Sequence, residues 1–489
     1  MPLATFSGLA SGIDSNALIK ALIEEKKKIK IKPLQNEIKD ISSSINQLNE
    51  LKSLAQKLAS KAQVFSPAYG GPVYRKAQSS DENKLTASAS SNATNGTYNI
   101  NVTQLASTSS VSFNTSYSSS SNLLVSGIND SLPGADRTVT IKYGQGSSQV
   151  IKNFVITSTT TVQEFIDSFN NQFSGIASAV LVNVGTNGSP DYRIFLKSAK
   201  TGLQEGMVDI SVAVSADPAL SAWNTNKTVT QAQDLNMTIT GISGTITKSS
   251  NTFSDLLPGV SFNVKQTGSI TLTVSVDSSE MTSKLGSFVE AFNDVVKFVR
   301  KNNKTTTSST TPGESIAKFA PLSRIRVDDS FVDQVRNKLI TMSAYNDPPP
   351  PSAKVFKLTD LGITTTGKDE TGAFDGTLAF DSSKFSAAMQ DDFQGVINLL
   401  TKIGNELATT TGLIEEYTAY NKLFDTTTNS LNNQKKDLET RLSEAEKALL
   451  QEEDTLLQTF ARLESTMGRL RSIQTNLAQA LASLPQYGR

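Results

Sequence analysis

Two groups of acidic residues have a spacing that could bind a cation. Asp328, Asp329 and Asp333 form the first group, and the stretch 369–375 resembles part of a calcium-binding loop. The first group lies where a helix is predicted to begin, and carboxylates stabilise a helix dipole there without a metal. The second group lacks the spacing and the closing glutamate of a calcium loop. Both groups are therefore interpreted as structural, and no metal site is predicted.

The chain contains no His and no Cys. Their absence excludes a thiol nucleophile, a Ser-His-Asp triad, His acid–base catalysis and a His/Cys metal site. It also excludes disulfide bonds. Gly144-Gln145-Gly146 is interpreted as a hairpin turn, because a phosphate-binding loop would need a following helix and lysine. The sequence therefore predicts neither an enzyme nor a cofactor-binding protein.

The charge balance argues against a nucleic-acid partner. Lys and Arg number 46, Asp and Glu also number 46, and charged residues make up only 19% of the 489 residues. The lysines within 26–32 are interpreted as a solvated helix face, because Ile29 and Ile31 interrupt them. No apolar run approaches the roughly 18 residues of a membrane span, and no signal peptide is recognised. We therefore expect no membrane insertion, and export by another route if the protein is extracellular.

Leucine recurs at every seventh residue near the C-terminal end of the chain. This spacing keeps one apolar stripe on one face of an α-helix, because two helical turns take about 7.2 residues. The stretch 431–484 would form a rod of roughly 80 Å. The series comprises Leu442, Leu449, Leu456, Leu463, Leu470, Leu477 and Leu484.

A second apolar stripe lies near the N-terminus, with spacings of three and four residues. It comprises Ile31, Leu34, Ile38, Ile41, Ile45 and Leu48. We expect the two stripes to meet, so that the chain leaves and returns to one helical stalk. The alternative is two separate helices in an all-α core. Glu452, Thr459 and Thr466 fall at the second seam position of the leucine helix, which predicts loose packing against other helices rather than a self-sufficient leucine zipper.

The middle of the chain alternates apolar and polar residues as β-strands do. Strands within 84–89 and 96–102, with a turn at Asn95-Gly96, are expected to pair with strands of 229–277. This pairing would make residues 76–112 and 229–277 a discontinuous β-rich head domain. Residues 113–228 would be a head domain inserted into it, ordered strand, strand, helix, strand, strand.

The fold predicted from these patterns is a multidomain α+β fold with long terminal coiled-coil legs. Residues 1–40 and 450–489 are expected to form flexible terminal leg helices. Residues 41–75 and 278–449 are expected to form a helical leg domain with a β-hairpin. That hairpin would pair Leu361-Gly362-Ile363 with Gly376-Thr377-Leu378-Ala379-Phe380. The two β-rich head domains would lie between the helical parts of the chain.

Several stretches resemble one family, the flagellar filament cap proteins, also called hook-associated protein 2. The stretch 98–106 (Tyr-Asn-Ile-Asn-Val-Thr-Gln-Leu-Ala), the stretch 251–260 (Asn-Thr-Phe-Ser-Asp-Leu-Leu-Pro-Gly-Val) and the helix 288–299 are similar to motifs of that family, in the same order. The N-terminal signature is also similar, and it includes Ser7, Gly8, Leu9, Ser11, Gly12 and Asp14. More weakly, the stretch 135–202 resembles a module shared among flagellins and cap proteins.

This resemblance implies a plate of β-domains on helical legs, secreted to the distal tip of the bacterial flagellum. The implied partners are further copies of the chain in a ring of roughly four to six subunits, flagellin, hook–filament junction proteins, an export chaperone and the flagellar type III secretion apparatus. The plate would promote the folding and polymerisation of exported flagellin and prevent its loss.

Other functions remain open at this point. The leading alternative is a surface adhesin that binds host glycans or cells through residues 113–228. A flagellin or hook–filament junction protein also pairs terminal helices, but the N-terminal signature argues against it. An enzyme is disfavoured because the chain lacks His, Cys and any convergent polar motif.

Overall fold

The computed structural model describes residues 12, 14–186, 188–303, 306–311, 314–318, 320–323, 325–365 and 375–482, without the side chains of 148, 306–311 and 314–318. The chain divides into two compact units. Met1–Pro72 and Ser279–Arg489 form a helical unit, and Val73–Ser278 form a β-rich unit.

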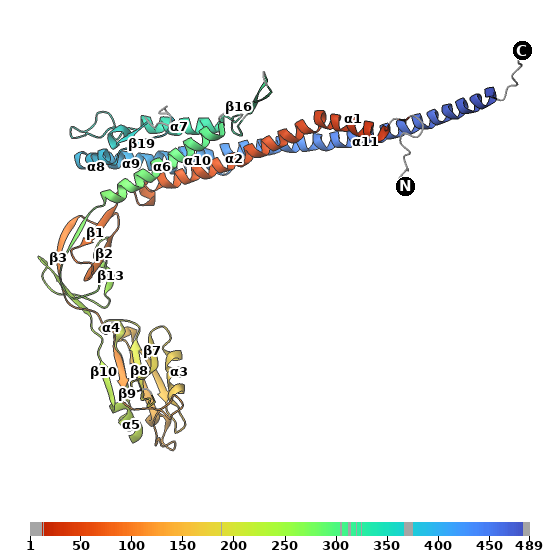
Figure 1. Ribbon diagram of the computed structural model, residues 1–489. Coiled ribbons are helices and arrows are strands. Elements are labelled where there is room, and N and C mark those ends of the chain that lie inside the picture. The colour runs from red at the N-terminus through yellow and green to blue at the C-terminus, as the bar shows by residue number, and fades with distance from the viewer. Residues whose placement is uncertain are drawn as a thin grey trace, which may run out of the picture. The chain divides into compact units, whose positions relative to one another are not determined.

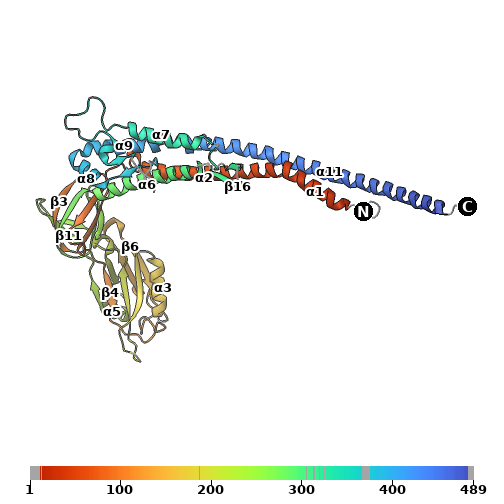
Figure 2. The same cartoon turned by 45° about the horizontal axis from the view of Figure 1, so that its top comes forward.

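The helical unit is built from both ends of the chain. Figures 1 and 2 both show α2 running beside α11, and α1 beside a later stretch of α11. Its helices are α1 (Ser15–Lys30), α2 (Lys32–Gln63), α6 (Ser278–Asn303), α7 (Val327–Thr341), α8 (Ser382–Asp391), α9 (Phe393–Ala408), α10 (Leu413–Thr418) and α11 (Leu423–Ala482). Its strands are β16 (Thr306–Thr311), β17 (Glu314–Lys318), β18 (Ile363–Thr364) and β19 (Ala379–Phe380). Short 3-10 helices span Pro67–Tyr69 and Leu358–Leu361.

Aromatic side chains hold the helical unit together where its helices converge. Phe331 of α7 lies edge-on to Tyr417 of α10 and Phe424 of α11, with ring centroids 5.0 and 5.5 Å apart. All three side chains are buried, and such pairs add to the free energy gained from apolar burial. The predicted hairpin is confirmed, because Ile363 pairs with Phe380 in an antiparallel ladder.

The β-rich unit begins and ends on paired strands. Strand β1 (Arg75–Ser79) lies antiparallel to β15 (Gly268–Val276), so the chain enters and leaves the unit side by side. A five-stranded sheet has the order β1-β15-β3-β11-β12, and a three-stranded sheet has the order β13-β14-β2. The other strands are β2 (Leu85–Ala89), β3 (Gly96–Gln104), β11 (Leu235–Ile239), β12 (Ile246–Lys248), β13 (Thr252–Leu257) and β14 (Val260–Val264).

Strands that precede the insertion pair with strands that follow it, but the turn at Asn95-Gly96 does not join two strands of one sheet. Strand β3 pairs with β11 and β15, and β2 pairs with β14, so strands from both sides of the insertion are joined. However, β2 and β3 belong to different sheets and do not form a hairpin. The chain between them crosses from one sheet to the other, since Ala93 is buried in the shared core and Ser90 donates to the carbonyl of Gly259.

A second lobe is inserted between β3 and β11, with its own core. Its four-stranded sheet has the order β10-β4-β8-β7 and its three-stranded sheet the order β6-β5-β9. The elements are β4 (Ser110–Phe113), β5 (Thr138–Tyr143), β6 (Val150–Val155), α3 (Val162–Gln172), β7 (Ala177–Asn183), β8 (Tyr192–Ser198), α4 (Leu203–Gly206), β9 (Val208–Val212), α5 (Pro218–Thr225) and β10 (Lys227–Thr230). Short 3-10 helices span Gly134–Arg137 and Gly146–Ser148.

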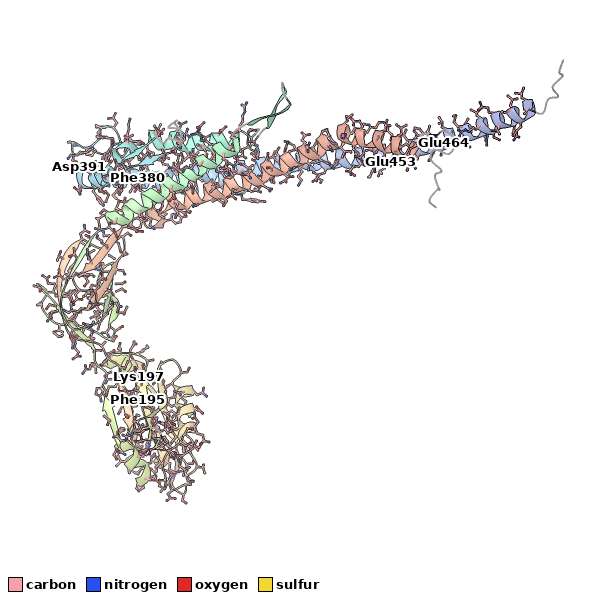
Figure 3. All side chains as sticks on the ribbon, viewed as in Figure 1. Phe195, Lys197, Phe380, Asp391, Glu453 and Glu464 are labelled. Atoms are coloured by element: carbon pink, nitrogen blue, oxygen red, sulfur yellow. The ribbon has the colours of Figure 1, made fainter. Side chains whose placement is uncertain are left out.

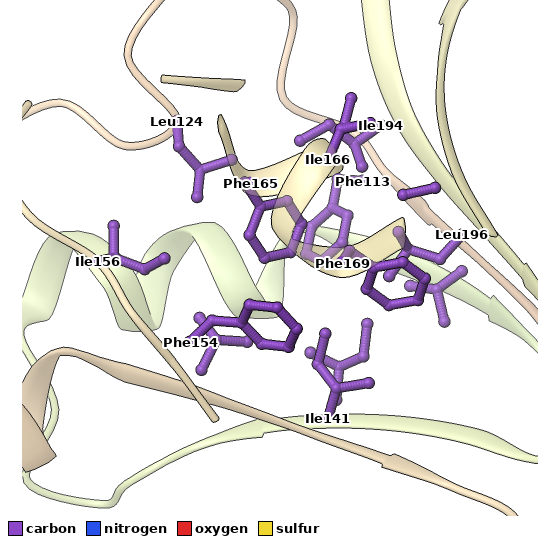
Figure 4. Packing of buried hydrophobic residues seen from close by; sticks show 14 of the residues in the cluster. Phe113, Leu124, Ile141, Phe154, Ile156, Phe165, Ile166, Phe169, Ile194 and Leu196 are labelled. Carbon is purple, nitrogen blue, oxygen red and sulfur yellow. The ribbon is translucent and has the colours of Figure 1, made fainter. Parts of the chain in front are cut away.

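The core of this inserted lobe is aromatic. Figure 4 shows Phe165 and Phe169 of α3 directed toward Phe154 and Ile141 of the smaller sheet. Helix α3 begins directly after Thr161, because Thr161 and Glu164 form a reciprocal capping box. The predicted succession of two strands, a helix and two strands corresponds to β5, β6, α3, β7 and β8.

The boundaries predicted for the inserted lobe need correction. A boundary between 112 and 113 would cut β4, which pairs with β8 and β10 and therefore belongs to the insertion. Strands β4, β9 and β10 complete the two sheets and were not predicted, because each is a short segment of four or five residues. Their side-chain alternation is too brief to distinguish a strand from a loop.

Gly202 marks a close approach between the two lobes of the β-rich unit. It has φ +87°, and a Cβ at this position would lie 2.6 Å from Ser249. Beside it, the hydroxyl of Thr201 donates to the carbonyl of Ser249 and the amide of Leu203 donates to Asp234 Oδ1 at 2.8 Å. A residue with a side chain at 202 would separate these contacts.

Candidate functional site

The N-terminal leg helix has a defined start and a defined break. Asp14 caps α1, since its Oδ1 accepts a hydrogen bond from the amide of Ala17 at 3.0 Å. The helix ends at Lys30, and α2 begins at Lys32 with Pro33 in its first turn. Proline fits the first turn because it lacks the N–H that would otherwise be unsatisfied there. The break at Ile31 therefore follows from the sequence.

Helix α1 packs against α11 through a small apolar cluster. Ile19, Ile23, Ile31 and Leu449 are buried in it, and the half-buried side chains around them are Leu442, Ala445, Leu456, Leu457 and Phe460. Lys26 forms an ion pair with Glu452 at the edge of the cluster. The hydrogen bond from Lys26 lowers the pKa of Glu452 below its ordinary value. This contact surface defines the leg formed by α1 and α11.

Helix α2 also contacts α11, and this contact lies nearer to the other helices of the helical unit than the contact of α1 with α11 does. Leu48 is completely buried, whereas Leu34, Ile38, Ile41 and Ile45 are half-buried. Beside them, Lys52 of α2 forms an ion pair with Asp425 of α11. The N-terminal stripe is therefore buried at its two ends, Ile31 and Leu48, and half-buried between them.

A shallow groove follows the contact between α1 and α11. One part has a volume of about 420 Å³ and is lined by both helices, including Ile23, Ile31, Leu449 and Leu450. A second part, of about 300 Å³, lies toward the start of α1 and is lined by Ile19 and Leu457 among others. Leu450 is 63% exposed. The groove therefore leaves apolar surface of both helices accessible.

Beyond Phe460 the leucines of the series are exposed among the described residues, and their packing against other helices stays a prediction. Leu463, Leu470 and Leu477 are 49%, 55% and 60% exposed. Helix α1 begins at Ser15, so its described residues cover α11 only as far as Phe460. Figure 3 shows Glu453 where α1 accompanies α11, and Glu464 farther along α11. Leu484 lies outside the described residues.

The predicted weak seam is not where the sequence placed it. Thr459 and Thr466 are exposed, and their hydroxyls donate to the carbonyls of Thr455 and Arg462 one turn earlier. Glu452 forms the ion pair with Lys26 instead of occupying an apolar seam. The apolar side chain beside Thr459 that contacts the cluster is Phe460. A nearly straight helix drifts against a strict seven-residue repeat, which displaces the seam in this way.

Only part of the N-terminal signature can be located. Ser7, Gly8, Leu9 and Ser11 lie outside the described residues. Gly12 has φ +76°, a conformation that favours glycine, and Asp14 is the cap of α1. The signature therefore ends at the point where the leg helix begins.

The acidic group at the start of α7 contains a feature that the sequence did not reveal. Asp329 accepts a hydrogen bond from Asn303 and Asp333 forms an exposed ion pair with Arg336. Asp328, by contrast, is completely buried, and neither of its carboxylate oxygens has a hydrogen-bond partner. Burial, with a smaller contribution from the charge of Asp329, raises the pKa of Asp328 to about 7.

The residues that the structure describes lack two further features. Among them, no set of three or more His, Cys, Asp or Glu side chains is arranged to hold a metal ion. Residues 369 and 370 of the second acidic group lie outside them. None of the described helices combines the length and the apolar character needed to cross a membrane.

The described side chains of the leg present apolar surface for contact with other helices. Both ends of the chain form a helical leg with exposed apolar residues, and the middle forms a β-rich unit of two lobes. These features define a structural assembly protein. Two family models match the chain: residues 11–109 match the N-terminus of flagellar hook-associated protein 2, and residues 232–472 match its C-terminus.

Curated relatives and a solved structure agree with these matches. The B-type flagellar hook-associated protein 2 of Pseudomonas aeruginosa PAO1 is 30% identical over 401 residues, which cover 76% of each chain. The flagellar hook-associated protein 2 of Escherichia coli K12 is 25% identical, over 84% of this chain and 83% of the relative. The crystal structure of the D1-D2-D3 domains of the flagellar cap protein from Escherichia coli has a TM-score of 0.54 at 22% identity, covering 80% of this chain and 99% of that one.

The chain belongs to the flagellar hook-associated protein 2 family, the family of flagellar cap proteins. The resemblance expected from the sequence motifs is thereby confirmed. The relatives described above are flagellar proteins, and they do not favour the surface-adhesin alternative.

Proposed function

We propose that this chain caps the distal end of the flagellar filament, with α1 and α11 acting as a leg that enters the filament end. The observation that carries this proposal is the exposed apolar stripe of α11. Leu463, Leu470 and Leu477 would each leave about half or more of their side chain in water unless other helices covered them. Covering such residues is favourable by roughly 25 cal/mol per Å² of apolar surface. A filament end that offers helices of its own is a partner of the required chemistry.

The leg is suited to contacts that form and separate repeatedly. Its apolar cluster is small, and its ion pair between Lys26 and Glu452 is partly exposed, with side chains 33% and 35% accessible. Partly exposed ion pairs contribute little to stability. The leg can therefore exchange partners each time a new filament subunit is added.

The β-rich unit would form the plate over the growing end. We propose that copies of the chain assemble into a ring of roughly four to six subunits, and that the plate retains exported flagellin while it folds and polymerises. The further partners proposed are hook–filament junction proteins, an export chaperone and the flagellar type III secretion apparatus. The location proposed is the distal tip of the secreted filament, and the role is structural rather than enzymatic.

The first experiment is deletion of the gene in its native host, with flagellin measured in the culture medium. Monomeric flagellin in the medium, together with short or absent filaments, is the expected result. Normal filaments without leakage would overturn the proposal. The leakage should disappear when the unaltered gene is restored.

A matched pair of variants then tests the leg. Leu470→Glu with Leu477→Glu places two charges on the exposed apolar stripe. Ser472→Glu with Gln479→Glu places the same charges, at the same spacing, on the opposite face of α11. We expect the first variant to be exported but to leave flagellin leaking, and the second to restore filaments. Equal filament growth with both variants would show that the stripe does not face the filament.

A further inference from the structure

Strand β7 forms one edge of the four-stranded sheet of the inserted lobe, and its partner in that sheet is β8. Backbone N–H and C=O groups point alternately to the two sides of a strand. The N–H of Val184, directly after β7, donates to the carbonyl of Asp191 at 2.8 Å, so residues an even number of positions away from Val184 bond to β8. The backbone groups of Leu181 and Asn183 therefore point to the unpaired side of the strand.

A side chain of the same lobe shows that this edge accepts an amide group. The side-chain carbonyl of Asn170, on α3, accepts a hydrogen bond from the N–H of Ala179 at 2.7 Å, and its amide nitrogen donates to the carbonyl of Ala179 at 3.0 Å. A residue of a neighbouring antiparallel strand would exchange the same two hydrogen bonds. Among the residues that the structure describes, nothing bonds to the backbone N–H or C=O of Leu181 or Asn183. The edge is therefore closed at Ala179 and open from Leu181 onward.

The solvent-facing side chains along this edge are apolar. Val180, Val182 and Val184 are 45%, 41% and 54% exposed. Phe195 of β8, marked on the inserted lobe in Figure 3, lies opposite Val180 in the ladder and extends this surface. Strand β7 contains no charged residue and no proline. Such residues normally protect an edge strand from pairing with another chain.

The other edge strands of the β-rich unit have protection that β7 lacks. Strand β2 lies beside β1, and each remaining edge strand carries a charged side chain. These residues are Lys76 in β1, Lys152 in β6, Asp209 in β9, Lys227 in β10, Lys248 in β12 and Asp255 in β13. Within the described part of the β-rich unit, β7 is therefore the edge best suited to accept another strand.

We propose that the open edge of β7, residues 181–184, binds an extended segment of an unfolded polypeptide chain as an additional strand. In this mode the backbone supplies the hydrogen bonds, so the segment needs no fixed sequence. Every second side chain of the segment would lie beside Val182 and Val184, which favours segments whose alternate residues are apolar. The proposal rests on the proposed function, in which the incoming chain is exported flagellin that has not yet folded.

The size of the open edge favours such a transient partner over a second copy of this chain. The edge is bounded on one side by Ala179, which Asn170 already covers. A strand added to so short an edge covers much less than the roughly 800 Å² per partner of a stable interface. A short added strand can hold an unfolded chain briefly and still release it when that chain folds.

A synthetic peptide tests the proposal on the purified full-length chain. The probe is fluorescein-labelled Lys-Thr-Val-Thr-Val-Thr-Lys, and its control has the same residues with a methyl group on the backbone nitrogen of each Thr and Val. The methyl groups remove the N–H donors that strand addition needs. Fluorescence anisotropy should show that the probe binds about tenfold or more tightly than the control, because each lost backbone hydrogen bond weakens binding. Equal affinity of the two peptides, or no binding of the probe, would overturn the proposal.

Two proline variants then locate the binding edge. Leu181→Pro removes an outward N–H from β7, and Val229→Pro removes one from β10, the opposite edge of the same sheet. Neither N–H belongs to the ladder within the sheet, so proline is compatible with both edge strands. We expect Leu181→Pro to weaken binding of the probe about tenfold and Val229→Pro to leave it unchanged. Equal binding of the probe by both variants would contradict the assigned edge.

A third variant separates loss of binding from loss of folding. Val182→Lys leaves the half-buried Leu181 in place and puts a charge on the open edge. It should weaken binding of the probe without altering the fluorescence of Trp223, which is buried in the core of the same lobe. Self-association of the chain that Leu181→Pro abolishes would overturn the proposal, because the edge would then pair two copies. Peptide binding is measured on the purified chain, so its failure is distinct from leakage of flagellin in the host.

Discussion

Asp328 is expected to make the helical unit less stable as the pH rises. Its side chain is completely buried, and its two carboxylate oxygens lack hydrogen-bond partners. Burial raises its pKa from the ordinary 3.8 to about 7. Because the folded state holds the proton more tightly than the unfolded state, folding is opposed increasingly as the pH rises from 3.8 to about 7.

The size of the effect follows from the pKa difference. Each pKa unit corresponds to about 1.4 kcal/mol, so a rise of about three units corresponds to roughly 4 kcal/mol at pH 8. Asp328→Asn replaces the carboxylate with a neutral group of the same shape. We expect the variant to equal the unaltered protein near pH 4, to be more stable by ~1.5 kcal/mol at pH 5 and by ~4 kcal/mol at pH 8.

The measurement must report on the helical unit. The single tryptophan, Trp223, lies in the inserted lobe, so its fluorescence is an internal control rather than a probe of α7. Urea unfolding followed by helical circular dichroism, together with hydrogen exchange across α7, gives the required free energies. Asp333→Asn is the matched control, because that exposed side chain forms only a surface ion pair. A stabilisation by Asp328→Asn that does not change from pH 4 to pH 8 would refute the reasoning.

Three further predictions concern the leg, the inserted lobe and the helical unit. Leu449→Ala removes a buried side chain from the leg and should weaken the contact of α1 with α11 by ~2 kcal/mol, measured as faster amide exchange in α1; unchanged exchange would contradict the assigned contact. Tyr117→Phe leaves the indole N–H of Trp223 without its acceptor and should destabilise the inserted lobe by ~1–3 kcal/mol. Urea unfolding followed by tryptophan fluorescence measures this loss, and an unchanged unfolding midpoint would contradict the assigned hydrogen bond. Burial acts to raise the pKa of Asp392, but hydrogen bonds from three backbone amides and a tyrosine hydroxyl lower it to about 2. The stabilisation that the Asp392 carboxylate provides is therefore present above its ordinary pKa of 3.8 and is lost as the pH falls toward 2. Asp392→Ala should cost ~2 kcal/mol of unfolding free energy at pH 7 and progressively less in acid, and a cost independent of pH would contradict this cause.

The helices were largely predictable from the sequence because their signals are local. The cap at Asp14, the break before Pro33 and the long apolar stripe each depend on residues a turn or two apart. The partner of each strand was less predictable. The alternation in β2 and β3 shows that each has one buried face, but it contains no information about which strand lies beside it. The crossing of the chain near Ala93 therefore had to come from the structure.

The limit of the leg contact was unpredictable for a similar reason. A leucine at every seventh position is the same signal at Leu449, which is buried, and at Leu477, which is exposed. Whether a stripe is covered depends on where the neighbouring helix begins, and among the described residues α1 begins at Ser15. Asp328 is the opposite case, because nothing in its sequence neighbourhood distinguishes it from Asp329, yet tertiary packing removes one of the two from water.

The paired entry and exit strands have an evolutionary consequence. Where β1 meets β15, the chain leaves and re-enters the helical unit through neighbouring antiparallel strands, and β4 with β10 repeats the arrangement for the inserted lobe. Neighbouring antiparallel strands bring their Cα atoms within about 5 Å of each other. The two ends of each inserted part of the chain therefore lie side by side. The inserted lobe is thus nested within the β-rich unit, which is itself inserted into the helical unit. A lineage can therefore lengthen, shorten or replace the inserted lobe while the residues that build the leg keep their spacing.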